Sequence, residues 1–519
     1  MKLKSKQNQP DLQPGGCCSA LFCYNDDWGT GLNLFGGSSM KKINILEKPA
    51  VMMIALLIII NAIGTTACGA RQTTENTAEQ STVSTAAAAE LHVSADGSDT
   101  NGDGTIASPF ATVSRAAQAA PGSLIIVHDG SYGPFELDKD CSGSEDSPTV
   151  IRAAEGETVV VRAEGEPCIS IRDASHIIIE GLETEGGSHG IMYESSREAG
   201  DEALCGITIR RCTVHGVRGI HGIGVYSCNN LAPVSDLTVE ECEVFDCDCG
   251  SSESVVLNGN IDGFLIAGNR IHDNNNIGID MIGFEGLAVH PDDENGKNPY
   301  EVDQVRNGVC RDNLVYNISS EGNAAYFEDG EYDLCADGIY VDGGRDIEIC
   351  NNFIFNCDIG LEVATEHSPE DNELFRVTGV SVHDNVIADC GGWTGICFGG
   401  YDIDLGFTED CVFDHNTLVD NDTQIGIQRS RNNHVYANLI LGGGTGVEYS
   451  EECREEDMKN EISGNLAAEF EDEDSWDSEF GTYFDDRQEI ADGFRSLTDD
   501  IGSRFVPDEE MMKIYRGNS

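Results

Sequence analysis

The chain has 519 residues, with 31 Lys and Arg against 92 Asp and Glu, which gives a formal net charge of −61. This acidity excludes nucleic acid as a partner, because each phosphate contact needs a Lys or Arg. It also excludes a polyanionic substrate, unless a divalent cation stands between the two. A hydrophobic content of 39% is enough for a large core, so we expect a folded protein.

The first element in chain order is an export signal over residues 40–68. Lys41 and Lys42 form a basic segment, an apolar run follows, and small residues precede Cys68. The apolar run is short for a transmembrane helix. The pattern resembles a bacterial lipoprotein signal, which implies lipidation at Cys68 and an extracytoplasmic, membrane-anchored protein. Simple secretion is the alternative.

The segments on either side of this signal lack the marks of a folded domain. Residues 1–39 fit no part of an export signal and are interpreted as a non-native upstream extension or a disordered segment. Residues 69–90 have no hydrophobic periodicity and are expected to form a flexible linker.

Two patterns then repeat along the body of the chain. The first is an Asn shortly before an aliphatic or aromatic residue, at Asn269, Asn313, Asn352, Asn385, Asn416, Asn438 and Asn465. The second is a Gly followed by an aliphatic residue, at Gly190, Gly222, Gly278, Gly338, Gly360, Gly395, Gly426 and Gly446. A unit of about 22 residues cannot bury its apolar face alone and must stack on its neighbours.

Stacked units of this kind predict an all-β fold, a single-stranded right-handed parallel β-helix over residues 91–470. The repeated Asn would form a buried amide ladder, with Cys212 and Cys242 in the same place in earlier coils. Other cysteines at aliphatic positions are expected to be buried free thiols. No paired CxxC motifs appear, so a cysteine-rich zinc site is not expected. Residues 471–519 are predicted to be an acidic C-terminal cap or tail.

The start of the body resembles a known fold family. The stretch LHVSADGSDTNGDGTIASPFATVSRAAQAAPGSLIIVHDGSYGPFEL is similar to the N-terminal cap and first coil of pectin-lyase-fold proteins, and the cap resembles that of β-helical pectate lyases. The resemblance is specific for the fold. It does not specify the reaction, because this fold carries lyases, glycoside hydrolases, transferases and adhesins.

The residue after each inward aliphatic of a strand points outward. Along the Gly-aliphatic pattern these outward residues are Met192, Gly224, Asp280, Tyr340, Glu362, Cys397, Gln428 and Glu448. Asp280, Tyr340 with Asp342, and Glu362 are therefore predicted to lie on three consecutive coils.

Asp342 and Glu362 would have their Cβ atoms about 8 Å apart. Carboxyls about 5–6 Å apart suit a retaining glycosidase, and a wider separation suits an inverting one. Repulsion between close acids would raise one pKa, so that one carboxyl can donate a proton near neutral pH. Two long insertions, 284–305 and 319–336, are expected to wall a cleft beside these acids.

The segment GIYVDGGRDIEICNNFIFNCDIGLEVATEH resembles the active-site coils of β-helical xylosidases. The resemblance implies Asp342 as nucleophile and Glu362 as acid/base. The chain departs from the family by a shorter spacing between the carboxylates, by two Gly after Asp342 and by two residues inserted before His367. Substrate-binding roles are expected for Asp280, Tyr340, Glu366 and His367. The structural alternative is that Asp342 starts a turn and Glu362 is a solvated surface residue.

The sequence therefore favours a glycoside hydrolase acting on plant-type glycans, as a monomer with no required cofactor. A neutral glycan such as a xylo-oligosaccharide suits the acidic chain better than a pectin. The first alternative is a calcium-dependent, pectate-lyase-like polysaccharide lyase, for which Lys297 is a candidate base. The second alternative is a non-catalytic surface adhesin or glycan-binding protein.

A separate calcium candidate lies in the cap. Asp99, Asn101 and Asp103 match the start of an oxygen-ligand calcium loop. The twelfth position is Phe110 where such a loop has Glu, so an Asx-rich turn is the alternative interpretation.

Overall fold

The structure is a computed structural model that describes residues 89–290, 298–400, 406–450, 459–487 and 501–518. The predicted export signal, Cys68 and the linker up to residue 88 lie outside these residues, as does Lys297. None of the helices in the described part of the chain is long and apolar enough to cross a bilayer.

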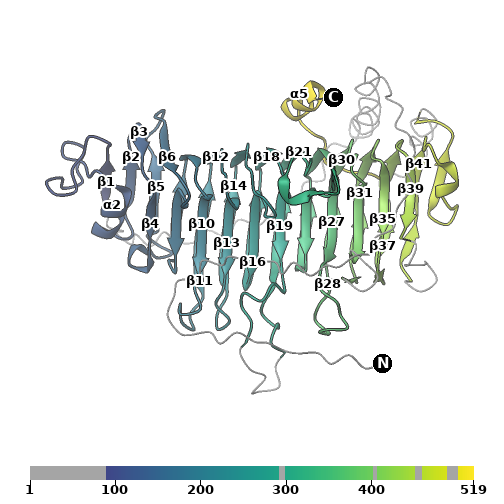
Figure 1. Ribbon diagram of the computed structural model, residues 1–519, viewed down its shortest axis with the longest axis horizontal. Coiled ribbons are helices and arrows are strands. Elements are labelled where there is room, and N and C mark those ends of the chain that lie inside the picture. Colours follow the sequence, from purple (N-terminus) through teal and green to yellow (C-terminus); the bar gives the residue numbers. More distant parts are fainter. Residues whose placement is uncertain (1–88, 291–297, 401–405, 451–458, 488–500, 519) are drawn as a thin grey trace, which may run out of the picture. The chain divides into compact units, whose positions relative to one another are not determined.

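The described residues form a right-handed parallel β-helix, as the sequence predicts (Figure 1). Through most of the body each coil gives one strand to each of three long parallel sheets, here called sheets 1, 2 and 3. Sheet 1 has 16 strands, sheet 2 has 11 and sheet 3 has 13. Parallel strands joined by a right-handed winding bury their inner faces on each other, so the core is a continuous column of apolar side chains.

The strand bounds follow sheet by sheet. Sheet 1 comprises β1 (Glu90–Val93), β2 (Leu124–Val127), β5 (Thr149–Ala153), β8 (Ile177–Glu180), β11 (Leu204–Arg210), β14 (Val234–Glu240), β17 (Ile261–Ala267), β20 (Val305–Arg311), β25 (Arg345–Cys350), β28 (Val377–Thr378), β29 (Ser381–His383), β32 (Thr408–Glu409), β33 (Val412–Asp414), β36 (Ser430–Arg431), β37 (His434–Tyr436) and β40 (Glu461–Ser463). Sheet 2 comprises β4 (Phe135–Leu137), β7 (Ile169–Arg172), β10 (His189–Ser195), β13 (His221–Ser227), β16 (Val255–Gly259), β19 (Ile279–Ile282), β24 (Asp337–Asp342), β27 (Ile359–Thr365), β31 (Thr394–Gly400), β35 (Thr423–Ile427) and β39 (Thr445–Tyr449). Sheet 3 comprises β3 (Gly130–Tyr132), β6 (Val159–Ala163), β9 (Glu183–Gly186), β12 (Thr213–His215), β15 (Glu243–Phe245), β18 (Arg270–Asn274), β21 (Leu314–Ile318), β26 (Phe353–Cys357), β30 (Val386–Ala388), β34 (Thr417–Val419), β38 (Leu439–Leu441), β41 (Asn465–Ala468) and β42 (Gly481–Phe484). A small antiparallel hairpin, β22 (Phe327–Glu328) and β23 (Glu331–Tyr332), stands apart from them.

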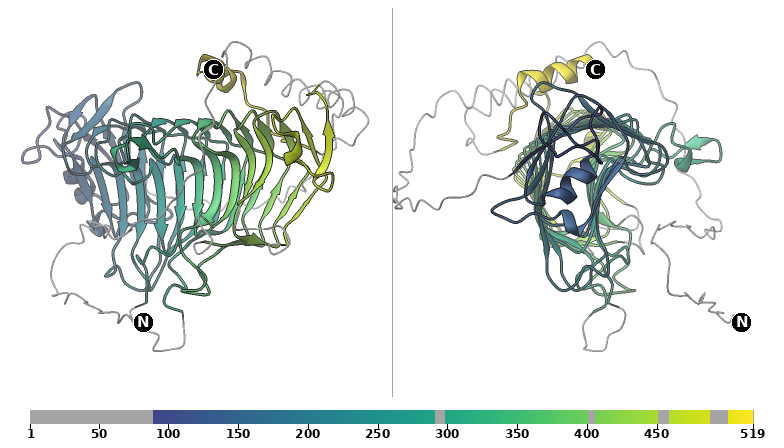
Figure 2. Two further views of the ribbon diagram at one scale, coloured as in Figure 1. Left: turned by 45° about the vertical axis from the view of Figure 1, so that its right-hand side comes forward. Right: turned by 90° about the vertical axis from the view of Figure 1, so that its left-hand side faces the viewer.

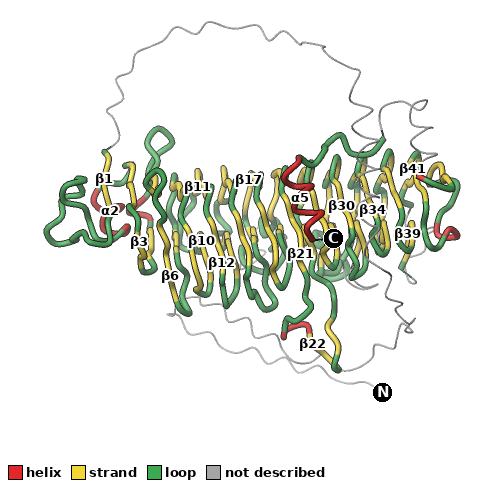
Figure 3. The backbone as a smooth tube through the Cα atoms, turned by 90° about the horizontal axis from the view of Figure 1, so that it is seen from above, coloured by secondary structure: helices red, strands yellow, loops and turns green. Residues whose placement is uncertain are grey.

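Helices cover two parts of this column. Helix α2 (Val113–Ala119) covers the N-terminal end of the core, with Val113, Ala116 and Ala117 buried (Figure 2). Helix α5 (Glu509–Asn518) lies along the outside of sheet 3 and buries Met512 and Tyr515 there (Figure 3). Short 3₁₀ turns are η1 (Lys139–Cys141), η2 (Ala324–Tyr326) and η3 (Glu473–Ser475).

The Asn pattern forms the ladder that the sequence predicts. At each step the Oδ1 atom of one Asn accepts the backbone N–H of the preceding Asn at 2.8–3.1 Å, from Asn269 to Asn465. The Nδ2 atom donates along the same ladder at 2.9–3.1 Å. The ladder starts at Cys242, whose N–H donates to Asn269 Oδ1 at 2.9 Å. Buried amides are thereby satisfied without water.

Two assignments in the outward column were wrong. Between Gly224 and Asp280 the chain makes one more sheet 2 strand, β16, whose outward residue is Val256. Because β16 has no Gly-aliphatic pair in this place, the pattern missed it. Near the C-terminal end Cys397 pairs with Gly426, so Gln428 is not the outward residue of that column. The inward aliphatic of β35 is Ile425, which Gln424 precedes, and the Gly one residue later misled the register.

Candidate active site

A column of polar side chains crosses sheet 2 where β19, β24 and β27 are neighbouring strands. Asp280 of β19 pairs in register with Tyr340 of β24, and Tyr340 pairs with Glu362 of β27. Asp342 follows two residues after Tyr340. All four residues are at most 9% exposed. The structure therefore brings together the residues that the sequence placed on three consecutive coils, and their burial is unlike that of solvated surface residues.

The two insertions before β24 bring further groups to this column. Glu285 of the first insertion lies 3.0 Å from the Nε2 atom of His367. Its carboxylate is also among the charges that act on Asp342. Tyr326 of the second insertion accepts a hydrogen bond from Asn276 Nδ2 at 3.1 Å. That these insertions enclose a cleft stays a prediction.

Together these residues form what we call the acid cluster. It consists of Glu253, Asp280, Glu285, Asp337, Asp342, Glu362 and Glu366. Glu253, Glu285 and Asp337 were not predicted from the sequence. Glu253 and Glu285 come from connections between strands. Asp337 precedes a Gly-aliphatic pair, so alternation alone would not assign it to the outer face. The one signal for it is its place at the start of the Asp342 strand.

Asp337 is the direct neighbour of Glu362. Its carboxyl donates a hydrogen bond to the Glu362 carboxylate, and the Cys397 thiol donates a second one. Burial raises the pKa of Asp337 well above its ordinary value, and the charge of Glu362 raises it further. Asp337 therefore keeps its proton and holds Glu362 in place.

Burial also raises the pKa values of Glu362 and Asp342, the two carboxyls predicted to be catalytic. It raises the pKa of Glu362 to about 7, against the two hydrogen bonds that lower it. The pKa of Asp342 is raised first by burial and then by repulsion from Glu366 and Glu285. Asp342 accepts a hydrogen bond from the N–H of Glu366 at 3.3 Å, and another from Thr365, and both favour its charged form. The two carboxyls thus have different surroundings, which is what separate acid and base roles require.

The acid cluster has little positive charge to balance it. Among the described residues no Lys or Arg forms an ion pair with its members. The basic groups beside it are two histidines: His367 Nε2 lies 3.0 Å from Glu285, and His221 Nδ1 lies 3.4 Å from Glu253 Oε2. Burial and then Glu253 and Asp342 raise the pKa of Asp280 well above its ordinary value. Oδ1 atoms of Asp280 and Asp337 are buried without a hydrogen-bond partner in the described structure. Unsatisfied oxygens of this kind can accept hydrogen bonds from a ligand rich in hydroxyls.

A second polar chain lies beside the acid cluster. The Tyr226 hydroxyl is 2.6 Å from His221 Nε2. His221 Nδ1 lies 3.2 Å from the backbone oxygen of Glu253, which can only accept, so this nitrogen carries the proton. Nε2 therefore accepts from Tyr226. Burial lowers the pKa of His221 to about 3, so its ring is neutral.

We expect Glu253→Gln to stabilise the protein at high pH. Burial raises the pKa of Glu253 to about 8, so the folded state binds its proton more tightly than the unfolded state does. Its contribution to stability is present below pH about 4.5 and is lost as pH rises through about 8, at about 1.4 kcal/mol per pH unit between these values. Thermal unfolding at pH 4 and pH 8.5 should show a higher Tm for the variant only at the higher pH.

The control for this variant is Glu198→Gln, which changes an exposed carboxylate. It should leave the Tm unchanged at both pH values. An equal change in Tm for Glu253→Gln at both pH values would contradict the raised pKa.

The candidate calcium residues of the cap hold the backbone. Asp99 accepts hydrogen bonds from the N–H groups of Ala111 and Thr112 at 2.8 and 3.1 Å, and Thr112 caps helix α2. Asp103 accepts from the Thr105 N–H at 3.0 Å, and the Asn101 N–H donates to a serine. These contacts are those of Asx turns. Calcium binding here stays a prediction.

Comparison with known proteins gives an uncharacterized relative and a pectate lyase. A 385-residue match has 36% identity with the uncharacterized protein YwoF of Bacillus subtilis and covers 68% of this chain and 75% of YwoF. A shorter match of 230 residues has 30% identity with pectate lyase PEL9 of Emericella nidulans and covers 39% of this chain and 52% of that enzyme.

Further matches concern the fold. The family model described as periplasmic copper-binding protein (NosD) matches residues 297–481. The solved structure of the GH136 lacto-N-biosidase from Eubacterium ramulus aligns with a TM-score of 0.51 at 13% identity, over 73% of this chain and 68% of that one. At this identity the likeness shows the β-helical fold alone. The extent of the match to YwoF shows more: the chain belongs to the family of right-handed parallel β-helix proteins that contains YwoF.

Proposed function

We propose that the protein is an exported carbohydrate-active enzyme that hydrolyses glycosidic bonds at the acid cluster. The observation that carries this proposal is the pairing of two dissimilar carboxyls on neighbouring strands. Glu362 has a pKa of about 7 and therefore holds a proton for part of the time at neutral pH. Asp342, on the adjacent strand, has a pKa that burial and repulsion from Glu366 and Glu285 raise well above its ordinary value, against hydrogen bonds from the Glu366 N–H and from Thr365 that favour its charged form.

Glycoside cleavage needs one of the two carboxyls protonated and the other ionised, and in this proposal the ionised one is Asp342. Glu362 donates its proton to the glycosidic oxygen as the bond to the sugar breaks, and Asp342 stabilises or attacks the anomeric carbon. If the carboxyls lie about 5–6 Å apart, Asp342 forms a covalent glycosyl intermediate and the configuration is retained. Glu362 then removes a proton from the water that releases the sugar.

The remaining residues suit the binding of a neutral sugar. Asp280, Tyr340, Glu366 and His367 surround the pair with hydrogen-bonding groups, which is the role we propose for them. A uronate would be repelled by the acid cluster unless a cation intervened. A neutral plant-type oligosaccharide is therefore the proposed substrate, and calcium is not required for the reaction. We further propose that the protein works as a monomer, held at the cell surface through Cys68 or released.

Product analysis tests this proposal. The whole protein would be incubated with a panel of neutral and uronic polysaccharides, with and without EDTA. Reducing sugars without the ultraviolet absorbance of an unsaturated uronate, formed equally in EDTA, would support hydrolysis. Unsaturated, EDTA-sensitive products would overturn it in favour of a lyase. The absence of products from every substrate would favour a glycan-binding protein.

One observation favours a lyase as a second candidate. The chain is 30% identical to pectate lyase PEL9 over 230 residues. A lyase needs a base for the proton next to the uronate carboxylate, and the described acid cluster contains no lysine. Tyr226 is the candidate base for this reaction, and its own proton would have to pass to His221 Nε2, against the burial that raises the pKa of Tyr226 and lowers that of His221. A divalent cation would have to screen the uronate from the acid cluster.

The variant Tyr226→Phe separates the two candidates. Under the lyase mechanism it should lower the elimination rate by about 10²–10⁴-fold, since it removes the base and leaves the ring in place. Under the hydrolase mechanism the rate of hydrolysis should change by less than about tenfold, because Tyr226 takes no part in that proton transfer. The exposed Tyr332→Phe is the matched control and should have no effect in either case.

A further inference from the structure

A second group of chemically active side chains lies on a different sheet from the acid cluster. Glu348 and Cys350 belong to β25 of sheet 1, and His383 belongs to the neighbouring strand β29, with Cys350 and His383 in register. A carboxylate oxygen, the thiol sulfur and an imidazole nitrogen of the three lie within 4.8 Å of one another. Three ligand types of this kind at this separation fit around a single metal ion.

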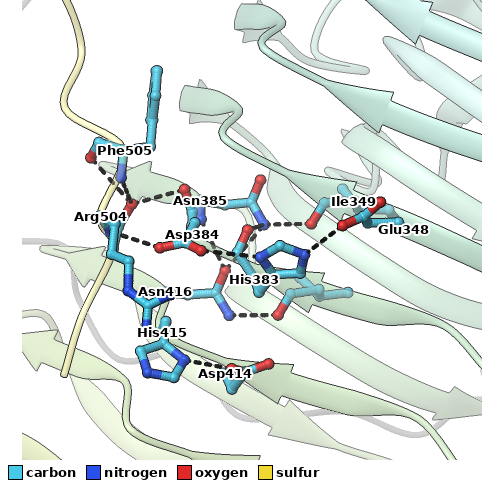
Figure 4. Close-up of polar contacts among 12 residues, drawn as sticks. Glu348, Ile349, His383, Asp384, Asn385, Asp414, His415, Asn416, Arg504 and Phe505 are labelled. Carbon is cyan, nitrogen blue, oxygen red and sulfur yellow. Dashed lines mark hydrogen bonds and ion pairs between the residues drawn. The ribbon is translucent and has the colours of Figure 1, made fainter. Parts of the chain in front are cut away.

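The imidazole of this group is held in one orientation. His383 Nδ1 lies 3.0 Å from Asp384 Oδ2, and His383 Nε2 lies 3.0 Å from Glu348 Oε1 (Figure 4). Asp384 is in turn held by the backbone N–H of Arg504, which donates to its Oδ1 at 2.6 Å. A carboxylate that binds the far nitrogen of a histidine is the usual support of a metal-ligating imidazole. In this structure it leaves Nε2 facing Glu348 Oε1.

Solvent can reach this group. The side chain of Glu348 is 50% exposed and that of His383 is 26% exposed, whereas Cys350 is buried and only 6% exposed. Cys350 has a free thiol. The further charges that act on it are those of Asp312, Arg311 and Asp384. Arg311 forms an ion pair with Asp312, so a cation approaching the thiol meets a net acidic surface.

We propose that Cys350 Sγ, His383 Nε2 and a Glu348 carboxylate oxygen bind a divalent transition-metal ion of the zinc type. Binding would displace the proton of the thiol and any proton on His383 Nε2, both of which pass to solvent. One nitrogen, one sulfur and one oxygen ligand suit zinc, with a water in the fourth place. The hard carboxylate makes the set a poor one for copper(I), and the thiolate makes it a poor one for calcium.

The ligands come from two coils, at sequence separations that no short motif contains. The ion would join β25 to β29 at the point where Asp384 ties the C-terminal segment to sheet 1. Binding of the ion is therefore expected to stabilise the stacking of these two coils. A second group of acids and histidine, on sheet 3, serves as a comparison: it consists of Glu183, Glu185 and His215. It lacks a thiol, and Arg162 lies 2.6 Å from Glu185.

Titration of the full chain with Co²⁺ tests the proposal, because cobalt takes zinc sites and gives a thiolate charge-transfer band in the near ultraviolet. We expect one equivalent of Co²⁺ to give this band, Zn²⁺ to remove it, and Zn²⁺ to raise the Tm. Cys350→Ser should abolish the band. Cys205→Ser is the control, because the Cys205 thiol also lies near a histidine, at 3.5 Å from His176 Nε2. This variant should leave the band unchanged.

Two further variants test the proposal even if Cys350→Ser fails to fold. Glu348→Gln alters a half-exposed side chain and should weaken Zn²⁺ binding at least about tenfold. Asp384→Asn keeps the three ligands and should weaken it by about 10–100-fold, because the imidazole loses its support. No charge-transfer band in the native protein, or an undiminished band in folded Cys350→Ser, would overturn the proposal and leave an ion pair of His383 with two carboxylates.

Discussion

Replacing Glu362 by Gln is expected to lower kcat/KM for glycoside hydrolysis by about 10²–10⁴-fold, the usual contribution of a general acid. The amide keeps the shape and can still accept a hydrogen bond from Asp337, but it cannot give a proton to the glycosidic oxygen. The loss should be smaller for aryl glycosides whose leaving group needs no protonation. Steady-state kinetics with a series of aryl glycosides measures both effects.

Glu448→Gln is the matched control. Glu448 lies in the same outward column, beyond Cys397 and Gly426, and its carboxylate binds Trp393 and Thr423. Its replacement should leave kcat/KM within about twofold of the native value, as for most surface changes. A Glu362→Gln enzyme with native activity, or an equal loss in Glu448→Gln, would rule out Glu362 as the acid.

The pH profile of the native enzyme should agree with this role. Glu362 must be protonated to act, so kcat/KM should fall as pH rises through about 7. The position of this limb is set chiefly by burial of Glu362, because the hydrogen bonds from Asp337 and Cys397 act in the opposite direction. Cys397→Ala should therefore move the limb to higher pH, while leaving the maximal rate close to the native one.

The fold could be predicted because its stabilising contacts repeat. A buried Asn recurs at one place in the coils from Asn269 to Asn465, and an inward aliphatic follows a small residue in most sheet 2 strands. Such a pattern is visible in a single sequence because each coil must match its neighbours. The prediction failed where a coil departs from the pattern. Strand β16 has no Gly-aliphatic pair, and in β35 Gly426, which directly follows the inward Ile425, was taken for a Gly that precedes an inward aliphatic.

The acid cluster was only partly predictable. Asp280, Tyr340, Asp342 and Glu362 follow from strand alternation. Glu253 and Glu285 come from connections between strands, whose paths depend on tertiary contacts such as that of Glu285 with His367. The proton on Asp337 follows from burial beside Glu362, which no spacing in the sequence reveals. The group around Cys350 escaped notice for a similar reason, because its ligands meet only when two coils stack.

A second large effect is expected in the Asn ladder, where Asn352→Asp should lower the free energy of unfolding by about 3–5 kcal/mol. The Nδ2 group of Asn352 donates to the Cys310 carbonyl at 3.1 Å and to Asn385 Oδ1 at 2.9 Å. An ionised carboxyl in this place would turn both contacts into repulsions between buried oxygens. The side chain is fully buried, so solvent cannot relieve them.

Urea unfolding of Asn352→Asp and of the matched variant Asn356→Asp, each at pH 8 and pH 4, tests this prediction. The comparison distinguishes the effect of burying a carboxyl from the effect of replacing an amide by a carboxyl. Asn356 is exposed and its Nδ2 donates to Asn317 Oδ1 at 2.6 Å, so its change should cost less than about 1 kcal/mol. The carboxyl introduced at position 352 should have a raised pKa, and its cost should therefore shrink as pH falls and it regains a proton to donate. Equal losses for the two variants would mean that the amide ladder contributes little to holding the coils in register, and that the apolar column alone does so.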